Sequence, residues 1–157
     1  MKRIVLRIKF TLYKAFLKIK YAQNITIGKG FSFRKHLNIN LNGGRLIIGD
    51  NVFLNNYCSI NVHKEILIGN NCIFGENVKM YDHNHKYKDK NDIIRNQGYS
   101  YGKIIIGDNC WIGSNVVILK GVNIGNNVII GANCVIYKSI PDNCVVKNSC
   151  NLEINEY

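Results

Sequence analysis

The stretch KIIIGDNCWIGSNVVILKGVNIGNNVIIGANCVIYKSIP, residues 103–141, carries a large aliphatic residue at every sixth position. The six positions are Ile106, Ile112, Ile118, Ile124, Ile130 and Ile136. A period of six is neither the helical nor the simple strand period, and it indicates one short strand and one tight corner repeated many times. The pattern predicts a solenoid of parallel strands whose coils bury their inner faces against one another.

Each six-residue repeat has the same internal order. A glycine often follows the isoleucine, as at Gly107, an asparagine lies three places on, as at Asn109, and a small residue fills the fourth place. Glycine and asparagine tolerate the left-handed or strained backbone of a tight corner. Two earlier runs, residues 48–60 and 68–80, share this period, with a slip of two residues between them. A sandwich of short strands is the alternative, but its strands would not recur every six residues with glycine in fixed phase.

The repeat breaks off at residues 81–103, YDHNHKYKDKNDIIRNQGYSYGK, which are polar, charged and aperiodic. We expect this stretch to be an excursion loop that leaves the solenoid. His83 and His85 open the loop, and a histidine held beside a rigid scaffold can act as a base near neutral pH. The same pair could bind zinc with a third ligand, such as His63 or a residue of a neighbouring chain. We favour the base and expect no metal.

Composition sets the broad class of the protein. At 157 residues the chain predicts one domain, and 46% hydrophobic residues are enough for a core. Six cysteines could indicate disulfides or a zinc site, but four of them fall in the small inward position of the repeat. These four are Cys58, Cys72, Cys110 and Cys134. Cysteines that serve as small buried hydrophobes indicate a reducing, cytoplasmic compartment.

Residues 1–22 form a basic amphipathic segment. Residues 1–20 carry seven of the Lys and Arg residues and no acid, out of a net charge of +11 for the whole chain. The segment lacks the apolar run of a signal peptide, and its charges recur too often for a spanning helix. Either it lies on an anionic membrane surface, or it covers the first coil or packs between subunits. Without a recognition motif, the charge does not indicate a nucleic-acid partner.

The strings WIGSNVVI, GVNIGNNVIIGANCVI and YKSIP resemble the closing half of the hexapeptide-repeat acyltransferases. The similarity covers residues 45–146 and is closest to the branch of maltose, galactoside, antibiotic and polysaccharide-cluster O-acetyltransferases. It implies an all-β fold, a left-handed parallel β-helix over residues 23–150, with a short N-terminal helical segment, the loop at 81–103 and a tail at 151–157. It also implies a homotrimer with active sites between subunits and acetyl-CoA as the donor.

The same resemblance suggests which residues handle the acceptor. The segment VKMYDHNHKYKD matches the family's loop and implies that His85 is the general base, with His83 as the second choice. Asn55, in FLNNYC, matches an asparagine that contacts the acceptor or the acetyl group. Asp82, beside the two histidines, is placed with the acceptor as well.

Five further residues are expected at the donor. Trp111 matches a tryptophan near the thioester end of acetyl-CoA, and Ser114 and Ala132 match positions whose backbone contacts the pantetheine arm. Tyr137 and Lys138 match the pair near the phosphate end of CoA. Each residue also has a purely structural interpretation, such as a corner position or a solvated lysine, and the combination rather than any one residue favours the donor site.

The sequence therefore predicts an acetyl-CoA-dependent O-acetyltransferase acting on a sugar of a surface polysaccharide or glycolipid intermediate. The alternatives are an N-acetyltransferase on an amino sugar nucleotide, a non-catalytic hexapeptide-repeat scaffold, and a zinc hydrase. Backbone N–H groups at Gly113 or Ser114 are expected to stabilise the oxyanion, and Lys120 to attract the CoA phosphates. The C-terminal stretch VVKNSCNLEINEY departs from the family's Pro-containing pattern, which leaves Lys147 as a substitute phosphate contact.

Overall fold

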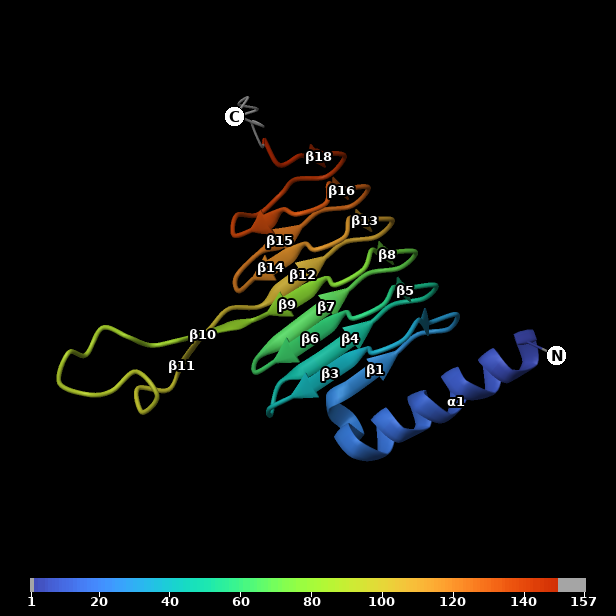
Figure 1. Ribbon diagram of the computed structural model, residues 1–157, viewed down its shortest axis with the longest axis horizontal. Helices are drawn as coiled ribbons and strands as arrows, with labels where there is room; N and C mark the ends of the chain where they lie inside the picture. The colour runs from blue at the N-terminus through green and yellow to red at the C-terminus, as the bar shows by residue number, and fades with distance from the viewer. Residues whose placement is uncertain (1, 150–157) are drawn as a thin grey trace, which may run out of the picture.

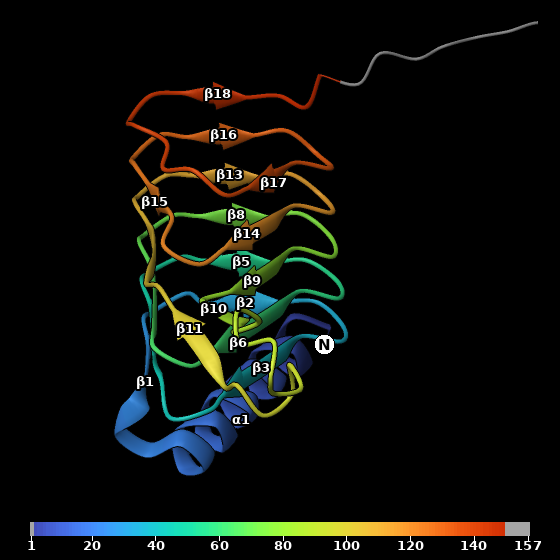
Figure 2. The same cartoon turned by 90° about the vertical axis from the view of Figure 1, so that its left-hand side faces the viewer.

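The chain folds as a triangular prism of stacked coils, with one helix at its base (Figures 1 and 2). The computed structural model describes residues 2–149, with side chains from residue 10 onward. Helix α1 (Lys2–Tyr21) and a short 3-10 turn, η1 (Ala22–Asn24), precede the strands. The strands that form the sides of the prism pair in parallel from one coil to the next, and the prediction of a left-handed parallel β-helix is confirmed.

Three parallel sheets form the sides of the prism. The first sheet contains β1 (Ile25–Ile27), β4 (Arg45–Ile48), β7 (Glu65–Ile68), β12 (Ile104–Ile106) and β15 (Asn123–Ile124). The second contains β2 (Ser32–Phe33), β5 (Phe53–Leu54), β8 (Ile73–Phe74), β13 (Trp111–Ile112), β16 (Ile129–Ile130) and β18 (Val145–Val146). The third contains β3 (Asn38–Leu41), β6 (Ser59–Val62), β9 (Lys79–Tyr81), β14 (Val117–Leu119) and β17 (Val135–Ile136).

The interior of the prism is a continuous column of the residues that the period of six singles out. The repeating isoleucines from Ile106 to Ile136 are all at most 5% exposed. The small residues of the fourth place lie inside with them, including Cys58, Cys72, Cys110 and Cys134. This confirms that these four cysteines occupy the core as small buried residues. Burying the aliphatic column against the coils above and below is what holds the stack together.

Asparagines form many of the corners, as their spacing predicts. Eight have a positive φ between 55° and 62°, the left-handed region. They are Asn51, Asn71, Asn77, Asn109, Asn115, Asn127, Asn133 and Asn143. Their side chains also bond from coil to coil, because Asn77 Nδ2 donates to Asn115 Oδ1 at 2.9 Å and Asn115 Nδ2 donates to Asn133 Oδ1 at 3.1 Å. Asparagine therefore has two roles at the corner: its backbone adopts the left-handed conformation, and its side-chain amide forms hydrogen bonds to the next coil.

The glycines after the isoleucines have a different role from the one predicted. Gly107 and Gly125 do not have a positive φ, so backbone strain does not explain them. They are required by close approach of the coils: a Cβ added to Gly107 would lie 2.7 Å from the carbonyl carbon of Gly125. A Cβ on Gly69 would meet the carbonyl oxygen of Gly107 at 2.7 Å in the same way. The close spacing of these coils thus leaves no room for a side chain at Gly69 and Gly107.

Helix α1 packs under the first coil and covers its open end (Figure 2). Leu17 is buried, and the rings of Phe10 and Tyr13 lie 5.1 and 4.6 Å from the ring of Phe33. The Tyr21 hydroxyl donates to the carbonyl oxygen of Ile39 at 2.9 Å. The first coil has no other coil below it, so this helix keeps its apolar interior from water.

Within residues 2–149, none of the helices is both long enough and apolar enough to cross a bilayer.

The excursion predicted at 81–103 leaves the prism between the third and fourth coils (Figure 1). Its root is more ordered than the aperiodic sequence predicts, because β10 (His83–His85) and β11 (Tyr99–Tyr101) form an antiparallel ribbon. The chain then re-enters the stack at β12, where Ile104 pairs with Ile66. The predicted tail at 151–157 lies outside the described residues.

Candidate active site

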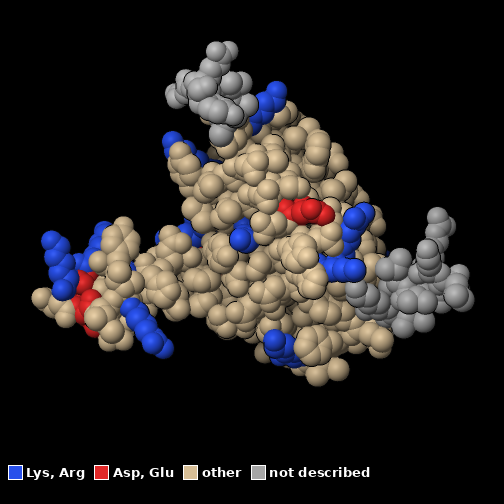
Figure 3. Space-filling view, in the orientation of Figure 1, with Lys and Arg blue, Asp and Glu red and all other residues tan. Residues whose placement is uncertain are grey.

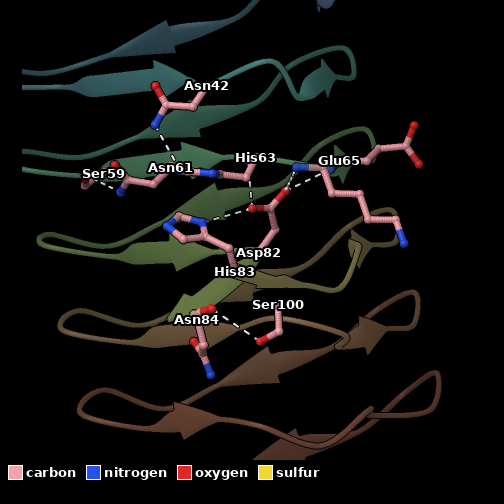
Figure 4. A network of polar contacts seen from close by, with 10 residues as sticks. Asn42, Ser59, Asn61, His63, Glu65, Asp82, His83, Asn84 and Ser100 are labelled. Atoms are coloured by element: carbon pink, nitrogen blue, oxygen red, sulfur yellow. Dashed lines mark hydrogen bonds and ion pairs between the residues drawn. The ribbon is translucent and has the colours of Figure 1, made fainter. Parts of the chain in front are cut away.

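Asp82 anchors the histidine ribbon to the prism (Figure 4). Its side chain is fully buried and accepts hydrogen bonds from the backbone N–H groups of His63, Lys64 and Glu65 at 2.7–2.8 Å. His83 Nδ1 lies 3.1 Å from Asp82 Oδ1. With both oxygens engaged inside the chain, Asp82 positions its neighbours, and this geometry gives no support to the predicted contact with the acceptor.

The carboxylate also selects the tautomer of His83. An ionised carboxylate can only accept a hydrogen bond, so His83 Nδ1 carries the proton that lies between them. The lone pair of the neutral ring is therefore on Nε2. A buried carboxylate that orients an imidazole in this way is the arrangement that prepares a histidine to accept a proton.

His63 completes an aromatic cluster around the root of the ribbon. Its ring centroid lies 3.7 Å from that of His83 and 4.8 Å from that of Tyr99. The ring centroid of His85, which pairs with Tyr99 across the ribbon, lies 4.5 Å from that of Tyr99. Asn42 Nδ2 donates to His63 Nε2 at 2.9 Å, which requires an unprotonated nitrogen at that position. Burial, followed by the nearby His83, lowers the pKa of His63 below its ordinary value of 6.5.

This lowered pKa predicts that the protein loses stability in mild acid. The folded state binds a proton on His63 less readily than the unfolded state, so the contribution of His63 is present above about pH 6.5 and declines as the pH falls below it. We expect the thermal midpoint to fall between pH 7.5 and pH 5, and the fall to be smaller in His63→Gln, which keeps an acceptor for Asn42. An identical pH dependence in the wild type and the variant would contradict the assignment.

His85 lies at the edge of a cavity formed mainly by the excursion loop. The cavity has a volume of about 690 Å³. It is lined by Asn84, His85, Lys86, Tyr87, Lys88, Asp89, Asp92, Gln97, Ser100 and Lys120. Lys120 comes from the prism, just after β14, so the cavity lies between the loop and the scaffold. His83 is not part of its lining, and this separates the two histidines: His83 is held by Asp82, whereas His85 faces the space that a ligand could fill.

Three of the predicted ligand contacts lie along the corner that follows the second sheet, here called the serine edge. Asn55 follows β5, Ser114 follows β13, and Ala132 follows β16. Ser114 and Ala132 lie in adjacent coils, since the carbonyl oxygen of Ser114 accepts from the N–H of Asn133 at 2.9 Å. The Ser114 hydroxyl accepts from the N–H of Glu76 at 3.2 Å.

One expected oxyanion donor is already engaged at this corner. The N–H of Gly113 donates to the carbonyl oxygen of Ile130 at 2.7 Å as part of the bonding between coils. Gly113 is therefore not available to an oxyanion, and of the two predicted donors only Ser114 stays a candidate. The reason is that Gly113 continues the ladder of β13 by one residue, which the repeat alone does not reveal.

An exposed apolar column runs up the outer face of the second sheet beside this edge. The strand register aligns Ile73, Trp111, Ile129 and Val145 on four successive coils. Each of these side chains is between 38% and 59% exposed, with Trp111 at 55%. A contiguous exposed column of this kind marks an interaction surface more often than an isolated exposed side chain does.

The other predicted residues lie along the corner that follows the third sheet, here called the histidine edge. His63 follows β6, Asp82 and the ribbon follow β9, Lys120 follows β14, and the pair Tyr137 and Lys138 follows β17. Lys138 Nζ lies 5.6 Å from the centroid of the Tyr137 ring, a cation–π distance. One chain thus places His63, the histidine ribbon, Lys120 and Lys138 on one edge of the prism, and Asn55, Ser114 and Ala132 on a different edge.

Sequence reasoning missed the roles of His63, Tyr99 and Asn42. His63 was considered as a third zinc ligand, and the two others were not singled out. One signal was present: HNH and YSY both alternate large rings with a small polar residue, which is the period of a strand. In the described part of the chain, no three His, Cys, Asp or Glu side chains gather in a way that could hold a metal ion.

Comparison with known proteins identifies the class to which this prism and its histidine-bearing loop belong. A family model described as bacterial transferase hexapeptide (six repeats) matches residues 103–138. A solved maltose O-acetyltransferase from Clostridium difficile 630 is 36% identical with a TM-score of 0.66, over 85% of this chain and 71% of that chain. The protein therefore belongs to the hexapeptide-repeat acetyltransferases.

Two further solved structures show what this fold accommodates. A galactoside acetyltransferase in complex with coenzyme A is 30% identical with a TM-score of 0.59, over 74% of this chain and 59% of that chain. An N-acyltransferase from Bacillus cereus, solved with dTDP and coenzyme A, is 17% identical with a TM-score of 0.66, over 78% of this chain and 68% of that chain. The second likeness is one of fold alone.

Proposed function

We propose that the protein transfers an acetyl group from acetyl-CoA to a hydroxyl of a sugar, with His85 as the general base. The observation that carries this proposal is the position of His85 on the rim of the cavity of about 690 Å³ between the excursion loop and the prism. The similarity to a maltose O-acetyltransferase and to a galactoside acetyltransferase solved with coenzyme A supports both the donor and the sugar acceptor. The acceptor that we favour is a sugar of a surface polysaccharide or glycolipid intermediate.

A complete site in this proposal requires two chains. The base lies on the histidine edge, whereas Ser114 and Ala132 lie on the serine edge, so one prism alone does not bring the two sets together. A second copy that presents its serine edge to the histidine edge of the first would join them, and the three equivalent joints of a homotrimer would each hold one site. The exposed column that includes Trp111 supplies an apolar surface for such a contact.

The chemistry requires a weak nucleophile to attack a thioester. Binding the sugar and acetyl-CoA in one cleft removes much of the entropic barrier of a reaction between two molecules. A neutral imidazole at His85 takes the hydroxyl proton as the new C–O bond forms, and then returns a proton to the departing CoA thiolate. In the tetrahedral intermediate, the backbone N–H of Ser114 is the proposed donor to the oxyanion.

Cationic side chains on the histidine edge suit a donor that carries several negative charges. Lys120 and Lys138 follow successive strands of the third sheet, β14 and β17, and are proposed to attract the phosphates of CoA. Cys110 takes no part as a nucleophile, because its thiol is buried and lies 3.1 Å from the carbonyl oxygen of Gly125. Among the described residues five cysteines are not paired in disulfides, and this usage supports a cytoplasmic location for the reaction.

The test is an acceptor screen with acetyl-CoA in which release of the CoA thiol and acetylated product are both measured. We expect turnover with sugars that offer hydroxyl groups, and little with matched amino sugars or amino sugar nucleotides. Transfer only to amines would reassign the protein as an N-acetyltransferase, a function that the fold also supports in the Bacillus cereus N-acyltransferase. Absence of acetyl-CoA binding by calorimetry would instead favour a scaffold without catalytic function.

A further inference from the structure

The outer face of helix α1 carries an apolar stripe that none of the described side chains covers. Leu12, Phe16 and Ile19 are 65%, 54% and 83% exposed, and their spacing of four and three residues places them on one side of the helix. The inner side is used differently, since Leu17 is buried against the first coil. The helix therefore has two apolar faces, and only one of them is explained by the fold.

The prism holds this stripe in a fixed orientation. The Tyr21 hydroxyl bonds to the carbonyl oxygen of Ile39 at 2.9 Å, and Lys14 Nζ donates to the carbonyl oxygen of Gly28 at 2.7 Å. Together with the rings of Phe10 and Tyr13 on Phe33, these contacts tie the inner side of the helix to the base of the prism. The helix lies at the end of the prism opposite to the C-terminal coils (Figures 1 and 2). The stripe is on its exposed side, whereas Leu17 is buried against the first coil.

Charge identifies the kind of surface that would cover the stripe. Lys18 and Lys20 in the last turn flank it and are both exposed, and residues 1–20 contain seven Lys and Arg residues without an acid. A second copy of the same helix would bring like charges together, which disfavours packing between copies. On the face shown in Figure 3, Lys and Arg are spread over the prism, and acidic side chains gather mainly in the excursion loop.

We propose that helix α1 docks the protein on the surface of an anionic lipid bilayer. In this arrangement Leu12, Phe16 and Ile19 enter the boundary between headgroups and acyl chains, while the flanking lysines contact the anionic headgroups. The helix lies in the plane of the surface and does not cross it. The interaction is independent of the transfer reaction, because it uses the outer side of the helix at the base of the prism.

The test is sedimentation of the full chain with vesicles. We expect binding to vesicles of phosphatidylcholine mixed with phosphatidylglycerol, much weaker binding to phosphatidylcholine alone, and a loss at high salt. The variant Lys18→Gln/Lys20→Gln should lower the partition coefficient about thirtyfold, and the charge-preserving Lys18→Arg/Lys20→Arg should retain it. The variant Leu12→Gln/Phe16→Gln/Ile19→Gln should lower it on the order of a hundredfold.

Measurements of folding and of oligomeric size on the same samples serve as controls. All five substituted side chains are exposed, so circular dichroism and the thermal midpoint should match the wild type. Equal binding to neutral and anionic vesicles, or wild-type binding by the triple variant, would overturn the proposal. A change of oligomeric size in the triple variant, seen by light scattering without vesicles, would also overturn it, because the stripe would then be a contact between copies.

Discussion

Replacing His85 with asparagine is expected to lower kcat for sugar acetylation about 10²–10⁴-fold, since this is the usual contribution of a positioned general base. The affinity for acetyl-CoA should change little, because the donor contacts are assigned to other residues. The matched control is His36→Asn. His36 stacks on Tyr57 at a corner of the first coil, and asparagine tolerates its positive φ of 58°.

His83→Asn separates the two candidate bases. Asp82 holds His83, so this variant should disturb the root of the ribbon and lower both activity and thermal stability. A loss of activity confined to His83→Asn, with His85→Asn near wild type, would move the base to His83. Isothermal calorimetry with acetyl-CoA and thermal scans on both variants distinguish loss of the base from loss of the local fold.

Mixing two inactive variants tests whether each site is shared between chains. If the base comes from one subunit and the thioester contact from its neighbour, co-expressed His85→Asn and Trp111→Ala chains form some joints with both residues intact. Random assembly of a trimer should then recover about a quarter of the wild-type activity. No recovery, with mixed trimers verified by mass, would place both residues in the same subunit's site.

Gly107→Ala is expected to destabilise the protein by roughly 3 kcal/mol, which lowers the thermal midpoint by about 6–12 °C. The added Cβ would lie 2.7 Å from the carbonyl carbon and 2.8 Å from the carbonyl oxygen of Gly125. These are backbone atoms of a stacked coil, so relief requires the two coils to move apart. The aliphatic column inside would then lose contacts over several positions.

Gly131→Ala is the matched control for this prediction. Gly131 also follows a repeating isoleucine, but an added Cβ would come no closer than 3.3 Å, to the carbonyl oxygen of Val146. Because alanine also restricts the unfolded chain, this variant should be neutral or slightly stabilising. Thermal unfolding of both variants tests this prediction. Equal midpoints for Gly107→Ala and Gly131→Ala would contradict it, because they would show that the spacing of the coils does not require glycine at position 107.

The fold could be predicted from the sequence because every coil requires the same types of residue at the same positions. The isoleucines recur at the period of the corners, and burial selects the same small residues four places on, so one repeat specifies the next. The reason for the glycines could not be obtained in this way. Gly107 is explained by its distance to Gly125 in the next coil, and such a distance depends on how closely the coils stack.

The candidate site was only partly predictable for a similar reason. His83 and His85 were found because they interrupt a regular pattern, but their different environments depend on Asp82, which turns back to contact the backbone of residues 63–65. Contacts between residues that are 17–19 positions apart leave no trace in a local pattern. The ribbon was missed because its two strands are only three residues long and are separated by the loop that they support.

The place where the excursion leaves the stack allows its length to vary between related proteins. The chain leaves after β9 and returns at Ile104, directly beside Ile66 of the coil below, so the stack closes whatever length of chain lies between. Lengthening such a segment costs little, about 0.6 kcal/mol for each doubling. Insertions or deletions in the excursion can therefore change the residues that line the cavity while the coils of the prism stay the same. A change of acceptor specificity by this means does not require a loss of scaffold stability.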